Sequence, residues 1–258
     1  MIAFLLALAA VQAQPQTPPS REPALEAEYA RCTELVKSDA EKAIQVAGDW
    51  RLRGGGIYAR QCLGLAYVQL ERWAPAATAF EQAAQDAESA RDGRRADFWV
   101  QSGNAWLAAN EPAKARAAFD AALATTLLTP ELRGEVYLDR GRAGVALNDL
   151  AGARKDLDEG VKLVPGDPFG WYLSSALAVR LSDLPRAQSD IAEAVRLAPD
   201  NADLLVHAGN VAGLSGEVEA AKGLYMKAIK AAPNSPAAAA ARAALAANPD
   251  QPAPAQSR

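Results

Sequence analysis

The sequence has 258 residues, of which 50 % are hydrophobic and 22 % are charged, and its net charge is −4. This composition is that of a folded protein, and the acidic balance excludes the general basic surface that nucleic-acid binding requires. Alanine dominates the apolar share and aromatic residues make up only 6 %, which favours closely packed helices over a β-sheet. We therefore expect an all-α protein without a nucleic-acid partner.

The chain opens with the apolar stretch MIAFLLALAAVQA, residues 1–13, which ends in the small-x-small pattern Val11-Gln12-Ala13. This pattern is typical of a secretory signal peptide, whereas a membrane-spanning helix needs roughly 20 apolar residues. We expect export to the bacterial periplasm and no integral membrane segment in the mature chain. No Lys or Arg precedes the apolar core, so a cytoplasmic location is the alternative. Four prolines within residues 14–23 predict a disordered spacer.

Three segments in the second half share one layout: ARKDLDEGVKLVP, AQSDIAEAVRLAP and AKGLYMKAIKAAP. Their first residues, Ala153, Ala187 and Ala221, are 34 positions apart. In each segment a large apolar residue follows four positions later, then a small residue, then a closing proline. Looser copies begin at Ala76 and Ala115. A fixed period of this length predicts stacked pairs of helices, in which small residues allow close approach of the backbones.

These repeats resemble the tetratricopeptide repeat, whose pattern is W-x2-L-G-x2-Y, then A-x3-F and a closing proline. The resemblance extends from about Ile57 to Pro233. Two units depart from the pattern, with Gly144 at an aromatic position and Ser175 at the glycine position. The matching residues are Leu63, Gly64, Tyr67, Ala76 and Phe80; Trp99, Gly103, Trp106, Ala115 and Phe119; Tyr137, Gly141, Ala153 and Pro165; Trp171, Ala187 and Pro199; and Gly209, Ala221, Tyr225 and Pro233.

The resemblance implies an α-solenoid of antiparallel helix pairs over residues 24–247. Extra turn material at 90–97 and 124–135 accounts for the longer spacing of the early units, and a disordered tail is expected at 248–258. Within the solenoid we expect a degenerate helix pair at 24–56, five repeats starting near residues 57, 96, 134, 168 and 202, and a capping helix at 236–247.

The two cysteines, Cys32 and Cys62, fall in first helices of adjacent units, which pack side by side. In an exported protein such a pair is predicted to form a disulfide bond. Two buried free thiols are the alternative, because cysteine in a cytosolic helix is usually a small buried side chain. The separation of 30 residues excludes a redox-active C-x-x-C motif.

Few residues suggest catalysis, so we predict no enzyme, no cofactor and no metal site. His207 is the single histidine and is expected to pack or hydrogen-bond between helices, because a histidine-based metal site needs more ligands. The carboxylates of KDLDEG, residues 155–160, are interpreted as a solvated helix surface. RGGGIY, residues 53–58, is interpreted as a flexible turn and the cluster Arg91, Arg94 and Arg95 as a solvated loop.

The resemblance implies that function depends on a concave groove lined by the first helices, which holds a peptide or a segment of another protein. Val100, Leu138 and Val206 either join this surface or pack between helices. A terminal-carboxylate clamp is in doubt, because the surface offers no Lys. We favour a partner segment with apolar side chains, whose backbone would hydrogen-bond to Asn104 and Asn210. The predicted groove residues are Tyr58, Gln61, Asn104, Leu107, Arg142, Phe169, Tyr172 and Asn210.

The sequence also allows a second function, as an alternative to binding a partner in the groove. The alanine-rich end helix around Arg242 has few polar side chains, although the terminal helix of a solenoid usually presents a polar outer face. This helix could drive self-association, which would make the protein a homo-oligomeric structural scaffold of the cell envelope.

Overall fold

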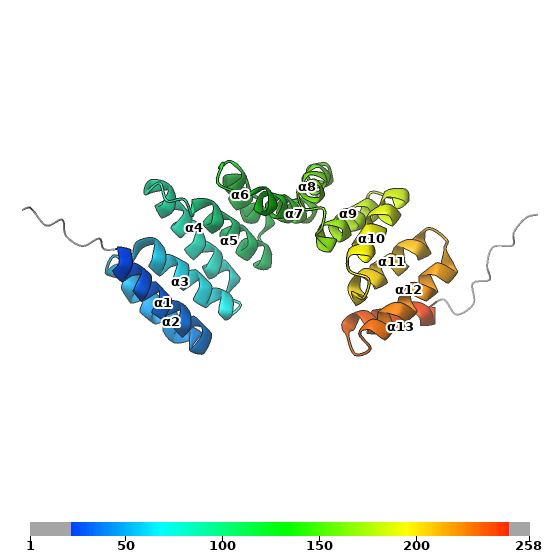
Figure 1. Cartoon of the computed structure of the whole chain (residues 1–258), viewed down its shortest axis with the longest axis horizontal. Helices are drawn as coiled ribbons and strands as arrows, with labels where there is room; N and C mark the ends of the chain where they lie inside the picture. Colours follow the sequence, from blue (N-terminus) through cyan, green and yellow to red (C-terminus); the bar gives the residue numbers. More distant parts are fainter. Residues whose placement is uncertain (1–21, 248–258) are drawn as a thin grey trace, which may run out of the picture.

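The computed structural model describes residues 22–247, and this part of the chain consists of α-helices joined by short turns. Figure 1 shows the helices stacked into an arch, with α1 and α13 at its opposite ends. The helices are α1 (Glu22–Ser38), α2 (Ala40–Leu52), α3 (Gly56–Gln69), α4 (Trp73–Ser89), α5 (Arg95–Ala108), α6 (Pro112–Leu123), α7 (Pro130–Ala146), α8 (Leu150–Leu163), α9 (Pro168–Arg180), α10 (Leu184–Leu197), α11 (Ala202–Leu214), α12 (Val218–Ala231) and α13 (Pro236–Ala247).

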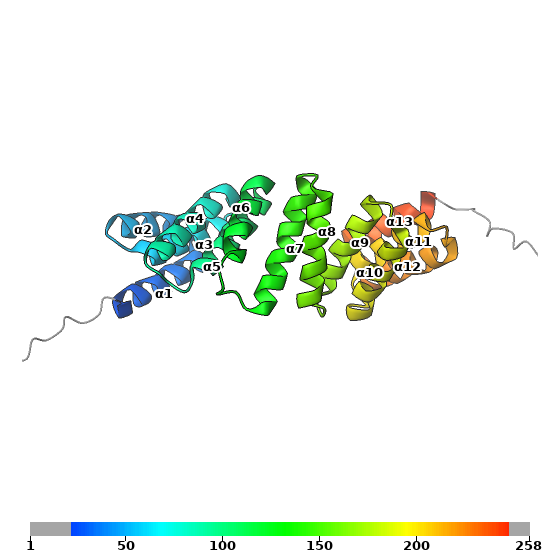
Figure 2. The same cartoon turned by 90° about the horizontal axis from the view of Figure 1, so that it is seen from above.

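The predicted all-α solenoid is confirmed. Consecutive helices pack against one another along the chain, and α3 with α4 through α11 with α12 form the five predicted pairs. The 34-residue period is visible in the helix ends, because α8, α10 and α12 end at Leu163, Leu197 and Ala231. A proline follows two positions after each end and cannot continue the helical hydrogen bonds. Figure 2 shows the same stack from above, with α7 and α8 near its middle.

Small residues mark the points where the two helices of a pair come together. A Cβ atom added to Gly103 on α5 would lie 2.4 Å from the Phe119 ring on α6, and one added to Gly64 on α3 would lie 2.5 Å from the Phe80 ring on α4. No side chain fits at such a distance, so the glycine is what allows the aromatic ring to fill the crossing. The alternation of small and large residues in the sequence therefore reflects packing between paired helices.

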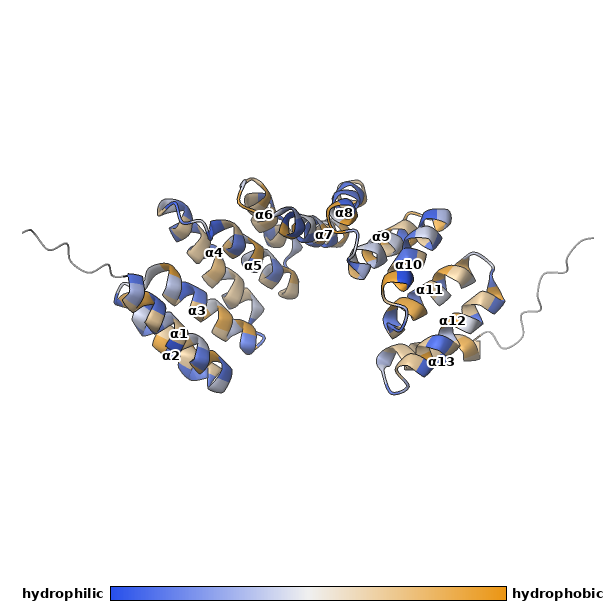
Figure 3. Ribbon diagram, in the orientation of Figure 1, coloured by the Kyte–Doolittle hydropathy of each residue, from blue (hydrophilic) through white to orange (hydrophobic). Residues whose placement is uncertain are grey.

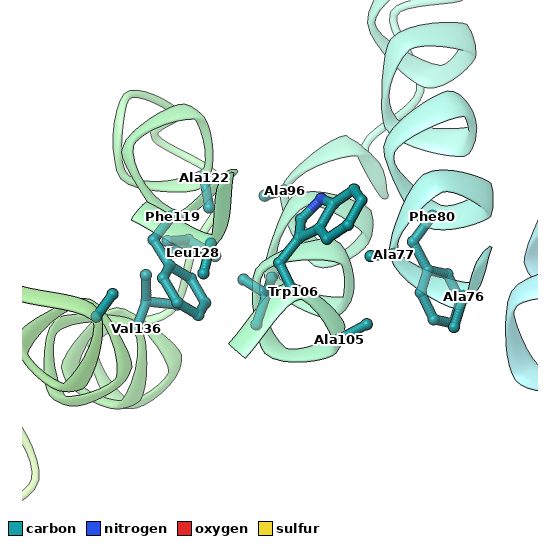
Figure 4. Packing of buried hydrophobic residues seen from close by; sticks show 13 residues of the cluster. Ala76, Ala77, Phe80, Ala96, Ala105, Trp106, Phe119, Ala122, Leu128 and Val136 are labelled. Carbon is teal, nitrogen blue, oxygen red and sulfur yellow. The ribbon is translucent and has the colours of Figure 1, made fainter. Parts of the chain in front are cut away.

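The largest buried cluster connects neighbouring pairs. Trp106 lies between Phe80 and Phe119 in Figure 4, and these three side chains belong to one continuous group of buried residues. Ala76 and Ala77 complete the contact on the α4 side. Figure 3 shows hydrophobic and hydrophilic residues interleaved along the helices, as expected when each helix buries one stripe and exposes another.

Two predicted boundaries are wrong. The third unit begins at Pro130 rather than near residue 134, because Thr129 accepts a hydrogen bond from the Leu132 N–H at 3.2 Å and Pro130 occupies the first turn. Much of the predicted loop 124–135 is therefore helix. The predicted spacer 14–23 also ends too late, since α1 begins at Glu22 and Pro23 is tolerated in a first turn. Residues 14–21, the predicted signal peptide and the predicted tail lie outside the described residues.

The first helix pair, α1 and α2, is fastened to the regular repeats by a disulfide bond. Cys32 on α1 and Cys62 on α3 are joined, with their Cα atoms 6.2 Å apart. Both side chains are buried in one cluster that also contains Trp50 and Ala59. The structure thus supports the predicted disulfide over the alternative of two free thiols.

Candidate functional site

Two aromatic rings on α9, one exposed and one half-buried, form a platform. Phe169 and Tyr172 stack with ring centroids 5.9 Å apart and an interplanar angle of 21°, and Phe169 is 45 % exposed. Ser175 donates to the backbone of α10 and Ala178 is buried in a cluster with Ile191, against which Tyr172 also packs. Exposure of a large aromatic ring has a cost in water, so the exposed Phe169 ring stacked on Tyr172 is a surface suited to contact with another molecule.

Arg142 on α7 joins this platform from the preceding repeat. Its guanidinium carbon lies 5.7 Å from the centroid of the Phe169 ring, and its Nη1 donates to Asp139 Oδ1 at 2.7 Å. Burial raises the pKa of Asp139 above its ordinary value, while the hydrogen bond from Arg142 opposes this rise. Three of the predicted groove residues, Arg142, Phe169 and Tyr172, are thus brought together across two repeats.

Behind the platform, Tyr172 is supported by His207 on α11. The two rings meet edge to face with centroids 5.0 Å apart, and His207 Nε2 lies 3.0 Å from Ser175 Oγ. Ser175 donates its own proton to the Ala187 carbonyl at 2.8 Å, so His207 donates from Nε2. Burial lowers the pKa of His207, which favours the neutral ring. The predicted role of His207 between helices is confirmed.

A cavity opens beside the platform, between α7, α8 and α9. Its volume is about 180 Å³. Arg142 lies at its edge together with Arg180 at the end of α9, and Arg180 donates to the Val145 carbonyl at 3.1 Å and to Asn148 Oδ1 at 2.9 Å. The remaining lining is apolar and comes from Val145, Leu157, Leu173, Ala176 and Leu177.

The other predicted groove residues lie elsewhere along the arch. Tyr58 on α3 donates to Glu22 Oε1 at 2.8 Å, and Arg94 covers its ring at 4.4 Å, so it helps to pack the N-terminal end. Gln61 on the same helix is half-buried. On α5, Asn104 is exposed whereas Leu107 packs against the buried cluster. Figure 1 shows α3 and α9 in opposite halves of the arch, so these residues do not form one site.

Two apolar residues that could have joined the groove are packing residues. Val100 and Leu138 are buried, and Leu138 fills the space over Gly160 on α8 and Gly170 on α9. Val206 is partly buried against the cluster at the C-terminal end. The inner surface is therefore less apolar than the sequence suggested, because inward positions near unit boundaries are covered by the next repeat.

Asn210 belongs to a separate cavity at the C-terminal end. Its Oδ1 accepts a hydrogen bond from Tyr225 at 2.8 Å, and both residues line a cavity of about 440 Å³ between α11, α12 and α13. Lys222 on α12 lines the same cavity and bonds Glu219 at 3.0 Å. The predicted groove did not include this lysine, because its residues lie on first helices whereas Lys222 lies on a second helix.

A polar network missed by the sequence analysis holds α9 in position. Arg154 on α8 donates to Ser174 Oγ at 2.7 Å, and Ser174 donates to the buried Asp190 on α10. Arg186 bonds both Asp190 and Asp158, which links α10 to α8. Asp158 of the KDLDEG segment keeps 43 % of its side chain exposed, as a solvated surface predicts, but it also links α8 to α10.

Two other charged residues that were expected to face solvent instead contact neighbouring side chains. Asp156 accepts two bonds from Arg140 at 2.9 and 2.6 Å, and Arg140 also reaches Asp120 on α6 at 2.7 Å. Arg94 belongs to no solvated loop, because it bonds Asp92 and covers Tyr58. A charged residue on a repeat helix can face the neighbouring repeat, and the position of that neighbour is not visible from one helix alone.

Two general features of residues 22–247 bear on chemistry and location. No group of three or more His, Cys, Asp or Glu side chains in this part could hold a metal ion. Among its helices, none combines the length and the apolar character that crossing a membrane requires.

Comparison with known proteins identifies the fold. No protein-family model matches the sequence, and no curated protein matches it. Among solved structures, PilW, described as a widely conserved type IV pilus biogenesis factor, is similar with a TM-score of 0.70 and 19 % identity, covering 86 % of this chain and 98 % of PilW. PilF of Pseudomonas aeruginosa gives a TM-score of 0.67 and 15 % identity, covering 87 % and 99 % of the two chains.

A third solved structure carries the name of the repeat. YrrB, described as a TPR protein with an unusual peptide-binding site, gives a TM-score of 0.54 and 20 % identity, covering 72 % of this chain and 91 % of YrrB. At such identities the likeness concerns the fold alone. Together with the 34-residue period and the paired helices, it shows that this chain has the tetratricopeptide repeat fold.

Proposed function

We propose that the protein binds a segment of another protein over α7 and α9 and performs no chemistry itself. The observation that carries this proposal is the exposed Phe169 ring, stacked on the half-buried Tyr172 and with Arg142 beside it. Aromatic residues and arginine are the side chains that most often dominate binding energy at protein interfaces. An interaction role also agrees with the fold, since the similar protein YrrB is described as having a peptide-binding site.

The platform is held ready for binding by its surroundings. Tyr172 is fixed by His207, and the far side of α9 is tied to α8 and α10 through Ser174. A surface that is already ordered loses little conformational entropy when a partner binds. Rigid aromatic side chains on a fastened helix therefore favour recognition over a structural role for these residues.

We also propose that the protein works in an oxidising compartment, such as the bacterial periplasm. The Cys32–Cys62 bond supports this location, because disulfide bonds persist in secreted and periplasmic proteins and are rare in the cytosol. The apolar first thirteen residues point the same way. Mass spectrometry of the protein from fractionated cells would test both points, since an intact N-terminus with free thiols in the cytosol contradicts them.

The binding proposal can be tested by photo-crosslinking from a probe at Tyr172 in cells that make the protein. A defined partner should be captured there and not from a probe at Met226, which is exposed on α12. A Phe169→Ala, Arg142→Gln variant, in which the glutamine amide can still donate to Asp139, should lose the capture while its helical circular dichroism stays unchanged. Capture that survives in this variant would contradict the proposed surface.

The alternative function, a self-associating scaffold, is favoured by one observation on α13. Leu205, Gly209 and Ala212 of α11 are buried against α12, the second helix of their pair, and Ala208 is buried in the cluster it shares with Ile191 of α10. The residues 34 positions later on α13 are exposed, since no second helix follows within the described residues; these are Ala239, Arg242, Ala243 and Ala246. Light scattering distinguishes the two functions, because a monomer at micromolar concentration contradicts self-assembly through this face.

A further inference from the structure

We propose that the segment bound at this surface carries a large apolar side chain next to an acidic side chain. The apolar side chain enters the cavity between α7, α8 and α9, and the carboxylate lies between Arg142 and Arg180. This inference rests on the proposed function and adds the chemistry of the partner. It is carried by the cavity, by the two arginines at its edge and by the neutral partners of Arg180.

The size and lining of the cavity suit one apolar side chain of the bound segment. Its volume is about 180 Å³, and its walls include Leu157, Leu173 and Leu177. An apolar cavity of about 150 Å³ is large enough to hold benzene, so this one suits a single phenylalanine or leucine side chain. An apolar wall offers nothing to a polar side chain, which would lose its hydrogen bonds to water on entry.

The positive charge at the edge of the cavity favours an acidic side chain next to the apolar one in the bound segment. Arg180 donates to the Val145 carbonyl and to Asn148 Oδ1, both of which are neutral, so neither bond compensates its positive charge. Arg142 is paired with one carboxylate, Asp139. The cavity edge therefore carries a net positive charge on a protein whose net charge is −4. Charge-assisted hydrogen bonds from arginine to a carboxylate are among the strongest that proteins form.

The surface on both sides of the cavity favours an internal segment over a chain end. Phe169 is exposed at one end of α9, and Leu181, which directly follows Arg180, is 44 % exposed at the other. Leu147, at the end of α7, is also exposed beside the position of Asn148. A segment that continues in both directions can cover these apolar residues, whereas a C-terminus in the cavity would leave one side uncovered.

The test begins with a displayed library of random peptides flanked on both sides by linker sequence, selected against the full protein. Peptides that depend on Phe169 and Arg142 should share a large apolar residue next to Asp or Glu. For a selected peptide, Arg180→Ala should weaken binding by about tenfold to a hundredfold. Replacing the acidic residue of the peptide by its amide should have no further effect on that variant. Arg196→Ala on α10 is the control and should leave binding unchanged.

A second variant tests the cavity itself. Ala176→Leu places a larger side chain at the half-buried wall of the cavity and should reduce affinity for the selected peptide at least tenfold, while Ala240→Leu on the exposed side of α13 should not.

The outcomes separate the two proposals. Peptides that need Phe169 and Arg142 but lack the apolar and acidic pair would overturn this inference and leave the proposed function standing. Peptides that require a free C-terminal carboxylate would overturn the internal segment. A library that yields no peptide dependent on Phe169 contradicts both proposals.

Discussion

The ring of His207 on α11 meets the ring of Tyr172 on α9 edge to face, with centroids 5.0 Å apart. This contact joins a titratable side chain to a residue of the proposed binding surface. His207 donates to Ser175, which in turn donates to the backbone of α10. The polar chain therefore crosses three helices at the position where other repeats have a glycine.

Stability should fall as the pH is lowered through the ordinary pKa of histidine, and His207 should contribute to this fall. Burial holds its pKa below the ordinary value of about 6.5, so the unfolded chain takes up a proton before the folded one does. The stability from neutral His207 is present above about pH 6.5 and is lost as the pH falls through its lower folded pKa. Urea unfolding at about pH 7.5 and about pH 5.5 measures the effect.

His207→Gln is the matching variant, because glutamine can still donate to Ser175 but does not titrate. Its stability should change less between the two pH values than that of the natural protein. An equal change in both proteins would show that His207 titrates normally in the folded state.

Alanine at two helical glycines should change stability in opposite directions. Gly103→Ala places a methyl group 2.4 Å from the Phe119 ring and should destabilise the fold by about 1–3 kcal/mol. Gly223→Ala on α12 meets no atom within 4 Å and should stabilise it by about 0.5–1 kcal/mol, because alanine favours the helix. Chemical denaturation of the two variants checks this, and equal effects would contradict the close crossing of α5 and α6.

Removal of the buried carboxylate on α10 should be costly. Asp190 has only 8 % of its side chain exposed and bonds both Ser174 and Arg186. Asp190→Ala leaves the Ser174 hydroxyl without its acceptor, while Arg186 keeps its bond to Asp158, and should destabilise the protein by about 1–3 kcal/mol. The control is Glu193→Ala on the same helix, whose pair with Arg196 is exposed and whose loss should be close to neutral in urea unfolding. Similar losses in both variants would show that the network around Ser174 is not specifically stabilising.

Loss of the disulfide should loosen the N-terminal end. The bond closes a loop of 30 residues, for which chain entropy gives a stabilisation of about 3.5 kcal/mol. In a Cys32→Ala, Cys62→Ala variant, amide exchange should accelerate in α1 and α2 and stay unchanged in α9 to α12, because each repeat contacts mainly its neighbours. Uniform acceleration along the whole arch would contradict local fastening.

Much of the fold was predictable because each repeat carries the same local sequence signals. The prolines after α8, α10 and α12 and the glycines at Phe80 and Phe119 are local signals that recur in phase. The start of α7 was missed although its signal is present, because Thr129 and Pro130 form a normal helix start that the repeat period alone does not reveal.

The candidate site was predictable only in part. Arg142, Phe169 and Tyr172 were found by their positions within the repeats. Tyr58 and Asn210 were predicted in the same way but form hydrogen bonds at the two ends of the arch, to Glu22 and Tyr225. Arg180 was missed because nothing in its own helix marks it. Its role depends on the Val145 carbonyl of the preceding repeat.

The sequence by itself determined the helices, their pairing and the small residues at each crossing, because these depend on neighbours within one 34-residue period. Only the tertiary structure decided which charged and aromatic side chains meet across repeats. The contacts of Arg142 with Phe169, Arg154 with Ser174 and Tyr172 with His207 join residues whose helices belong to different units or pairs. Such contacts depend on how each pair is rotated against the next, and that rotation results from the summed packing of all the helices.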